Sequence, residues 1–185
     1  MSIEEVILVN EADEELGTIE KMEAHQKALL HRAFSVFIFN SKGEMLLQRR
    51  ALGKYHSGGL WTNACCSHPR PGETVEAAAT RRTMEELGFQ PQLKKVFAFT
   101  YRADFENGLT EYEYDHVLMG SFDGEPDPNP DEVSEYRYQR MDDIKADLES
   151  NPGLFTEWFK IVFQQVEQHL ELADWRISGL ANSKK

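Results

Sequence analysis

Residues 58–88 read GGLWTNACCSHPRPGETVEAAATRRTMEELG, and this stretch decides the fold. Residues 60–66 have the composition of a β-strand, and the prolines and glycine that follow indicate a loop. The spacing of apolar residues from about Thr74 to Leu87 predicts a helix, which Gly88 closes as a C-cap. This strand–loop–helix unit carries cysteine, histidine, arginine and glutamate side chains, a set that suits a phosphate, a divalent metal and proton transfer.

The segments on either side of this unit carry further strand and helix patterns. We expect strands over residues 3–9, 33–39, 44–50, 94–103, 112–122 and 135–139, and helices over residues 21–30, 141–149 and 155–172. Residues 40–43 are a turn signal, so the strands before and after them form a hairpin. The acidic, proline-rich residues 123–132 are typical of a surface loop. The class is therefore α/β or α+β, a mixed sheet flanked by helices.

The chain length of 185 residues fits a single domain. We expect its core to span about residues 30–172, with residues 1–29 contributing to the site. Residues 177–185 are expected to be frayed, because termini of this composition are poorly ordered.

Charge and cysteine content narrow the range of functions. The net charge of −12 argues against nonspecific binding to nucleic acid or to anionic membranes. The two cysteines are the neighbours Cys65 and Cys66, which cannot build a disulfide framework. The N-terminal sequence lacks the pattern of a signal peptide, and no apolar run is long enough to span a bilayer. We therefore expect a cytoplasmic protein.

The predicted helix carries Arg82 and Glu86 on one face, because residues four apart are neighbours on a helix. From the helix alone, a surface salt bridge is the simpler interpretation. The wider spacing favours another one, since five residues match most of the Nudix box, GX5EX7REUXEEXGU: Glu73, Arg81, Glu85, Glu86 and Gly88. In the Nudix family, which the segment resembles, this loop–helix–loop element places glutamates on Mg²⁺ bound to a diphosphate.

Two positions depart from the Nudix box. Ser67 stands at its first glycine, and Arg82 stands where hydrolases of the family carry a glutamate. A guanidinium cannot bind a metal ion, but its planar donors suit a diphosphate. The departures therefore favour holding a diphosphate intact over hydrolysing it.

Cys66 and His68 can face one cavity, because alternate residues of an extended chain point to the same side. Cys65 then points the other way. The simpler alternative is that both cysteines are small core residues and His68 is a loop histidine. However, the arrangement TN-x-x-C-x-H-P beside the altered box resembles type I isopentenyl-diphosphate isomerases. That resemblance implies a catalytic Cys66, a metal-binding His68 and a packing role for Cys65.

Glu111 and Glu113 are a second pair on one face of a strand. Two carboxylates in one cavity are costly unless a cation sits between them, although two solvated acids on an edge strand are the alternative. His25 and His31 lie six apart, so they converge only if the chain changes from helix to strand between them.

The resemblance covers nearly the whole chain, from Lys21 to Trp158, and implies a role for each of these residues. One metal, with Mn²⁺, Mg²⁺ and Zn²⁺ all compatible, is held by His25, His31, His68, Glu111 and Glu113. A second ion, Mg²⁺, bridges Glu86 and the substrate diphosphate, which is also bound by Lys21, Arg50, Lys54 and Arg82. Cys66 and Glu113 exchange protons with the substrate in either order, Tyr101 assists Glu113, and Trp158 stabilises a carbocation. No flavin or nucleotide is implied.

The other histidines, His56, His116 and His169, are interpreted as ordinary side chains, although His56 lies close enough to the cationic loop to touch a phosphate. We expect an isomerase that converts isopentenyl diphosphate to dimethylallyl diphosphate in isoprenoid biosynthesis, acting on this small molecule as a monomer or weak dimer. The alternatives are a Nudix hydrolase of another diphosphate and a noncatalytic binding protein of the same fold. Arg82 and the Cys66–His68 unit argue against the first, and the full set of polar ligands argues against the second.

Overall fold

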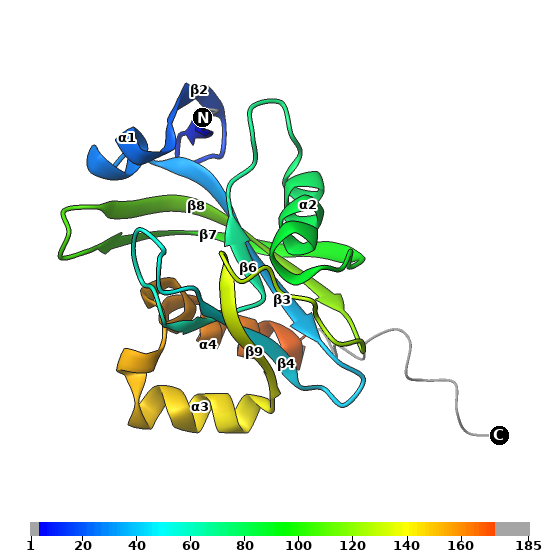
Figure 1. Ribbon diagram of the computed structural model, residues 1–185. Coiled ribbons are helices and arrows are strands. Elements are labelled where there is room, and N and C mark those ends of the chain that lie inside the picture. The colour runs from blue at the N-terminus through cyan, green and yellow to red at the C-terminus, as the bar shows by residue number, and fades with distance from the viewer. Residues whose placement is uncertain (1–3, 173–185) are drawn as a thin grey trace.

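The computed structural model describes residues 4–172 (Figure 1). Its strands are β1 (Glu5–Val9), β2 (Glu15–Glu20), β3 (His31–Phe39), β4 (Met45–Arg50), β5 (Trp61–Thr62), β6 (Cys65–Ser67), β7 (Leu93–Asp104), β8 (Thr110–Ser121) and β9 (Val133–Gln139). Its helices are α1 (Lys21–Gln26), α2 (Val75–Leu87), α3 (Met141–Ser150) and α4 (Glu157–Leu172), with a 3₁₀ turn at Pro152–Leu154. The mixed sheet flanked by helices confirms the predicted class.

Strand β3 is the centre of the sheet. It pairs in parallel with β8 and antiparallel with β6, β4 and β1, so β6 and β8 both lie against it. Strand β8 continues the sheet to β7, and β4 continues it to β5 and β9. Because β3 contacts strands from every part of the chain, residues distant in sequence meet along it.

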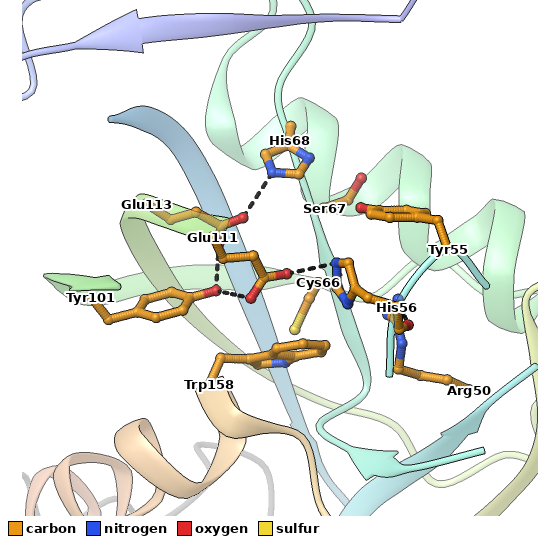
Figure 2. A pocket seen from close by; sticks show the side chains of 10 residues that line it. All are labelled: Arg50, Tyr55, His56, Cys66, Ser67, His68, Tyr101, Glu111, Glu113 and Trp158. Atoms are coloured by element: carbon orange, nitrogen blue, oxygen red, sulfur yellow. Dashed lines mark hydrogen bonds and ion pairs between the residues drawn. The ribbon is translucent and has the colours of Figure 1, made fainter. Parts of the chain in front are cut away.

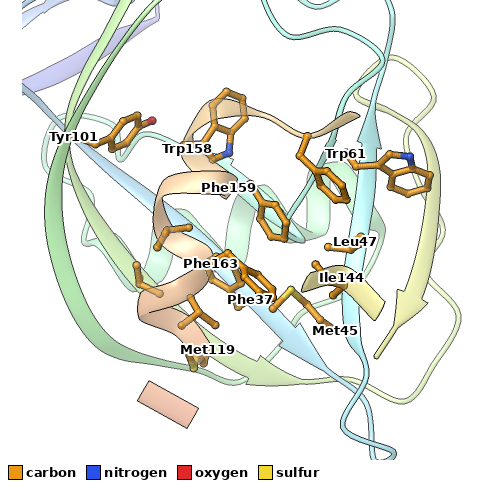
Figure 3. Packing of buried hydrophobic residues seen from close by; sticks show 14 of the residues in the cluster. Phe37, Met45, Leu47, Trp61, Tyr101, Met119, Ile144, Trp158, Phe159 and Phe163 are labelled. Carbon is orange, nitrogen blue, oxygen red and sulfur yellow. The ribbon is translucent and has the colours of Figure 1, made fainter. Parts of the chain in front are cut away.

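Two hydrophobic cores lie on opposite faces of this sheet. Phe37 and Phe39 of β3 pack against α4 and α3, and Figure 3 shows Phe37 among the aromatic side chains Phe159 and Phe163 of α4. The intervening residues Val36 and Ile38 belong to the second core, under α2. The alternation of side chains along β3 therefore assigns each residue to one helix layer.

The same alternation orients the functional strands. On β8, Val117 and Met119 belong to the core under α4, so Glu111, Glu113 and Asp115 point to that same side. They lie towards the end of the sheet beyond the N-terminus of α4, where the core gives way to a polar pocket.

Helix α2 has the predicted ends. The side chain of Thr74 caps its N-terminus by accepting from the Ala77 N–H, and Gly88 ends it with φ 76°. Gly88 also lies against the backbone of Asp127, where a Cβ atom would come within 2.7 Å of the Asp127 carbonyl oxygen. A glycine is therefore required here by both conformation and space.

The prediction of one continuous strand over residues 60–66 is wrong. The segment divides into β5, which pairs with β4, and β6, which pairs with β3. Asn63 lies at the break, where its Nδ2 donates to the carbonyl oxygens of Val36 and Cys65. These side-chain hydrogen bonds take the place of backbone pairing at Asn63. The chain passes there from pairing with β4 to pairing with β3.

Other boundaries also differ from expectation. Helix α1 ends at Gln26 instead of residue 30, because Ala28 adopts the left-handed φ of 52°. Helix α4 begins at Glu157, two residues later than predicted, and β2 was missed. The expected strand start at Ile3 and the frayed residues 177–185 lie outside the described residues. Within residues 4–172, none of the helices has the length and apolar character needed to cross a bilayer.

Candidate active site

A narrow pocket of about 30 Å³ opens where β6, β7, β8 and α4 meet (Figure 2). Its walls come from the loop after β4, from β6, from the β7–β8 pair and from the first turn of α4. The lining residues are Arg50, Tyr55, His56, Cys66, Ser67, His68, Tyr101, Glu111, Glu113 and Trp158. The structure therefore brings together most of the residues that the sequence singled out.

Three imidazoles and a carboxylate meet at one end of this pocket. Ligand atoms of His25, His31, His68 and Glu113 all lie within 4.8 Å of one another, and all four residues are buried. The Nε2 atom of His68 is 2.9 Å from Glu113 Oε1 and 3.2 Å from His31 Nε2. His25 lies in the last turn of α1 and His31 begins β3, so the change from helix to strand does allow them to converge.

Backbone carbonyls set the tautomers of two of these histidines. His25 Nδ1 lies 2.7 Å from the Lys21 carbonyl oxygen, and His31 Nδ1 lies 2.8 Å from that of Leu29. Each Nδ1 therefore donates its proton outward and leaves a lone pair on Nε2, directed into the cluster. The Nε2 of His25 is buried without a protein partner. Converging lone pairs beside a carboxylate are what a divalent cation requires.

His56 is not the ordinary loop histidine that the sequence suggested. It is 6% exposed, its Nε2 lies 3.0 Å from Glu111 Oε1, and its ring stacks on Phe105 with a centroid separation of 4.6 Å. Burial and the nearby Arg50 lower the pKa of His56 to about 3. Together with His25 and Glu111 it forms a second group of potential ligands, so Glu111 lies on the His56 side of the pocket.

His116 and His169 lie away from the pocket lining. His116 is also buried, contrary to the expectation of an ordinary side chain, and its Nε2 lies 2.9 Å from Asp13 Oδ2. His169, in the last turn of α4, contacts the ring of Phe97 of β7.

Tyr101 connects the two glutamates of β8. Its hydroxyl lies 2.7 Å from Glu113 Oε2 and 2.9 Å from Glu111 Oε2. Burial and the charge of Glu113 hold the pKa of Glu111 well above its ordinary value. Burial also acts to raise the pKa of Glu113, but its interactions with His31 and His68 outweigh burial and lower that pKa. The pKa values of the two carboxyls are thus shifted in opposite directions.

Cys66 faces this pocket and Cys65 does not. Cys65 is fully buried in the core under α2, whereas Cys66 borders the core on the α4 side. The thiol of Cys66 donates to Asn63 Oδ1 at 3.1 Å. Burial and the carboxyl of Asp115 raise the pKa of this thiol, so Cys66 keeps its proton at neutral pH.

Trp158 closes the apolar side of the pocket. It is 2% exposed, and Figure 2 shows its ring beside Cys66 and below the Tyr101–Glu111 pair. The guanidinium of Arg50 lies 5.1 Å from the ring centroid, and the ring of His56 meets it edge-on. An aromatic face therefore lies within a pocket that also holds acid and base groups.

Of the four cations predicted to bind a diphosphate, Arg50 lines the pocket, and Lys21, Lys54 and Arg82 are not among its lining residues. Lys21 lies over the Tyr55 ring, and Arg50 donates to the carbonyl oxygen of His56 at 3.3 Å. Arg82 Nη2 lies 2.6 Å from Glu86 Oε1, so this pair is a salt bridge, but Glu86 is buried and also accepts from Gln48 at 2.9 Å. The simple surface salt bridge is thus ruled out.

Sequence reasoning missed several groups. Ser35 lies 3.4 Å from the Cys66 sulfur and donates to Asp115 Oδ2 at 2.7 Å, and Asn63 orients the thiol. Asp115 could have been found, because it continues the alternate-residue pattern of Glu111 and Glu113. Ser35 carried no such signal, since its role depends on the pairing of β3 with β6.

The fold and the box place the chain in a known class, because the family model described as the NUDIX domain matches residues 29–159. The crystal structure of DR0079 from Deinococcus radiodurans has the same fold, with a TM-score of 0.73, 21% identity, and coverage of 88% of this chain and 98% of that one. A MutT protein from Methanosarcina mazei superposes with a TM-score of 0.62 at 18% identity, covering 75% of this chain and 94% of the other.

Nearer relatives identify the branch of that class. An "Isopentenyl-diphosphate Delta-isomerase 2" of Photorhabdus laumondii is 49% identical over 92% of this chain and 96% of its own length. An "Isopentenyl-diphosphate Delta-isomerase" of Pectobacterium atrosepticum is 50% identical over 91% of this chain and 94% of its own. The chain therefore belongs to the isopentenyl-diphosphate Delta-isomerase family of Nudix proteins.

Proposed function

We propose that this chain converts isopentenyl diphosphate to dimethylallyl diphosphate, with Cys66 and Glu113 as the groups that exchange protons with the substrate. The observation that carries the assignment is the shared pocket. Cys66 comes from β6 and Glu113 from β8, the strands that flank β3, and both side chains line one cavity closed by Trp158.

The chemistry requires such an enclosed arrangement. The double bond moves when a proton is added to the terminal alkene carbon and another is removed from the carbon next to the oxygen-bearing one. An unactivated alkene is a very weak base, so the protonated species is a tertiary carbocation that water would quench. The ring of Trp158 stabilises this cation without reacting with it, because its π-face is electron-rich.

The protein groups divide the proton transfers between them. Cys66 holds a proton because burial raises its pKa, and Glu113 is ionised because the histidines lower its own. Tyr101, hydrogen-bonded to Glu113, orients that carboxylate and relays its proton. Cys66 gives its proton to the terminal alkene carbon, and Glu113 takes one from the carbon next to the oxygen-bearing one. Both groups return to their starting states when Glu113 releases that proton and the Cys66 thiolate takes one up from solvent.

The histidine–glutamate cluster fits a divalent cation on the chemistry of its donors. His25, His31, His68 and Glu113 would bind it directly, with Glu111 nearby. When bound, the cation would neutralise the carboxylates and fix Glu113 against the substrate. Among Mn²⁺, Mg²⁺ and Zn²⁺, the three imidazoles favour Mn²⁺ or Zn²⁺, because Mg²⁺ prefers oxygen ligands.

We expect metal removal to lower both activity and stability. Extensive treatment with a chelator should abolish turnover and lower Tm by several degrees, because the imidazoles and the carboxylate then lose their common partner. The measurement is Tm and bound metal by elemental analysis, before and after adding back Mn²⁺ or Zn²⁺. His68→Gln should lose the metal, and the matched control His169→Gln, on the outer part of α4, should retain it.

Four cations, of which Arg50 lines the pocket, hold the diphosphate. Lys21, Arg50, Lys54 and Arg82 would supply the donors, and Glu86 would hold a Mg²⁺ that accompanies the substrate. Arg82 replaces a glutamate of the hydrolase box, and its salt bridge to the buried Glu86 occupies the place where a hydrolase has a carboxylate. The diphosphate is therefore bound without being cleaved.

One assay tests this function against hydrolysis. The protein is incubated with isopentenyl diphosphate, Mg²⁺ and Mn²⁺, and both dimethylallyl diphosphate and inorganic phosphate are measured. We expect the isomer and no phosphate. Phosphate without the isomer would show a hydrolase, and neither product would favour a binding protein.

A further inference from the structure

Glu132 is a carboxylate among the cations that hold the diphosphate. Its Oε2 is paired with the Lys54 ammonium, and its Oε1 lies 3.4 Å from Arg82 Nη2. Its side chain is only 23% exposed, although it belongs to the loop before β9 that the sequence predicted to lie on the surface. One carboxylate therefore contacts two of the proposed diphosphate-binding residues.

The loop holds Glu132 firmly in this position. Its carbonyl oxygen accepts from the Ala51 N–H at 2.9 Å, and its N–H donates to the Asn129 carbonyl oxygen at 3.0 Å. Asn129 in turn donates its N–H to the carbonyl oxygen of Glu86 at 2.9 Å. Glu132 is thus joined by backbone hydrogen bonds to the Lys54 loop on one side and to the end of α2 on the other.

The charges around Glu132 keep it ionised. Burial acts to raise its pKa, but the Lys54 and Arg82 cations outweigh burial and hold the pKa below its ordinary value. Lys21 has a comparable partner in Glu4, whose carboxylate lies 3.2 Å from its ammonium. Arg50 differs, since its contacts within the described residues are the carbonyl oxygen of His56 and the ring of Trp158.

We propose that Glu132 is an internal counter-anion of the diphosphate site, which neutralises Lys54 and Arg82 in the free enzyme and is exchanged for the diphosphate when substrate binds. This inference rests on the proposed function for its assignment of the cations. Each ion pair with Glu132 has to be given up before a phosphate oxygen can take its place. The carboxylate therefore weakens substrate and product binding and sets the affinity of the site for anions.

Whether removing the charge of Glu132 strengthens or weakens anion binding distinguishes the proposed role from a purely structural one. If Glu132 competes with phosphate, removing its charge tightens anion binding. If it only positions Lys54 and Arg82, removing it weakens binding, because Lys54 loses its carboxylate partner and Arg82 keeps only those of Glu85 and Glu86. Glu132→Gln is the informative variant, since the amide keeps the shape and one acceptor oxygen but loses the charge.

The test is calorimetric titration of the metal-loaded protein with inorganic pyrophosphate and Mg²⁺. We expect Glu132→Gln to bind pyrophosphate about three- to tenfold more tightly than wild type, the size expected for two partly exposed ion pairs. Glu132→Ala should shift in the same direction. The control Glu135→Gln removes an exposed carboxylate that pairs with Arg49 on the adjacent strand, and should leave the affinity unchanged.

Equal or weaker pyrophosphate binding by a folded Glu132→Gln protein would overturn the proposal. Unchanged Tm relative to wild type establishes that the variant is folded. Pyrophosphate binding does not depend on turnover. The counter-anion role and the isomerase function can therefore be rejected independently of each other. Tighter binding in a protein that yields no isomer would reject the isomerase function, whereas normal isomerisation without tighter binding would reject the counter-anion.

Discussion

Cys66→Ala is expected to lower kcat by at least about a thousandfold, the range in which removal of a positioned acid or base falls. The thiol has no substitute in the pocket, because the nearby Ser35 hydroxyl is committed to Asp115. Alanine removes the sulfur but leaves β6 paired with β3, so the fold should persist. The measurements are steady-state kinetics and the thermal unfolding midpoint.

The neighbouring cysteine provides the control for this prediction. Cys65 is buried under α2 and points away from the pocket, so Cys65→Ala should retain most of the wild-type kcat with a modest loss of stability. Substantial turnover in Cys66→Ala, or a collapse of activity in Cys65→Ala, would show that the wrong cysteine was assigned.

Glu113→Gln is expected to reduce kcat by a similar factor, about a thousandfold or more. The amide retains the size of the carboxylate and can accept from the Tyr101 hydroxyl, but it can neither take a proton nor carry a charge beside His31 and His68. KM should change little, because the cations that hold the diphosphate are untouched.

Loss of metal must be separated from loss of proton transfer in this variant. Kinetics are therefore measured with the metal content determined and with Mn²⁺ or Zn²⁺ added in excess. If the metal-loaded Glu113→Gln protein retained a tenth or more of the wild-type kcat, Glu113 would be a metal ligand without a part in proton exchange.

Local patterns predicted the fold class and the direction in which several site side chains point, whereas the roles of the site residues came from the resemblance to a known family. Residues four apart on α2 placed Arg82 beside Glu86, and alternation along extended chain separated Cys65 from Cys66. Those relations follow from backbone geometry, which depends only on sequence spacing. The same reasoning would have found Asp115, which lies on the same face of β8 as Glu113.

Contacts between distant segments could not be predicted in this way. His56 belongs to an irregular loop, and its burial depends on stacking against Phe105 in the turn between β7 and β8. Glu132 lies in an acidic, proline-rich loop with the composition of a solvated segment, and its backbone hydrogen bonds to Ala51 and Asn129 bring it to the cations. Strand β2 was missed because half of its residues are exposed, none is buried, and they show no apolar alternation.

The most direct test of the account is the product formed from unlabelled isopentenyl diphosphate in deuterated water with the metal-loaded enzyme. Proton exchange through Cys66 and Glu113 predicts dimethylallyl diphosphate with deuterium in its newly formed methyl group, and no inorganic phosphate, by NMR and mass spectrometry. Dimethylallyl diphosphate free of deuterium would contradict proton delivery by exchangeable side chains. Inorganic phosphate in place of the isomer would contradict the isomerase itself.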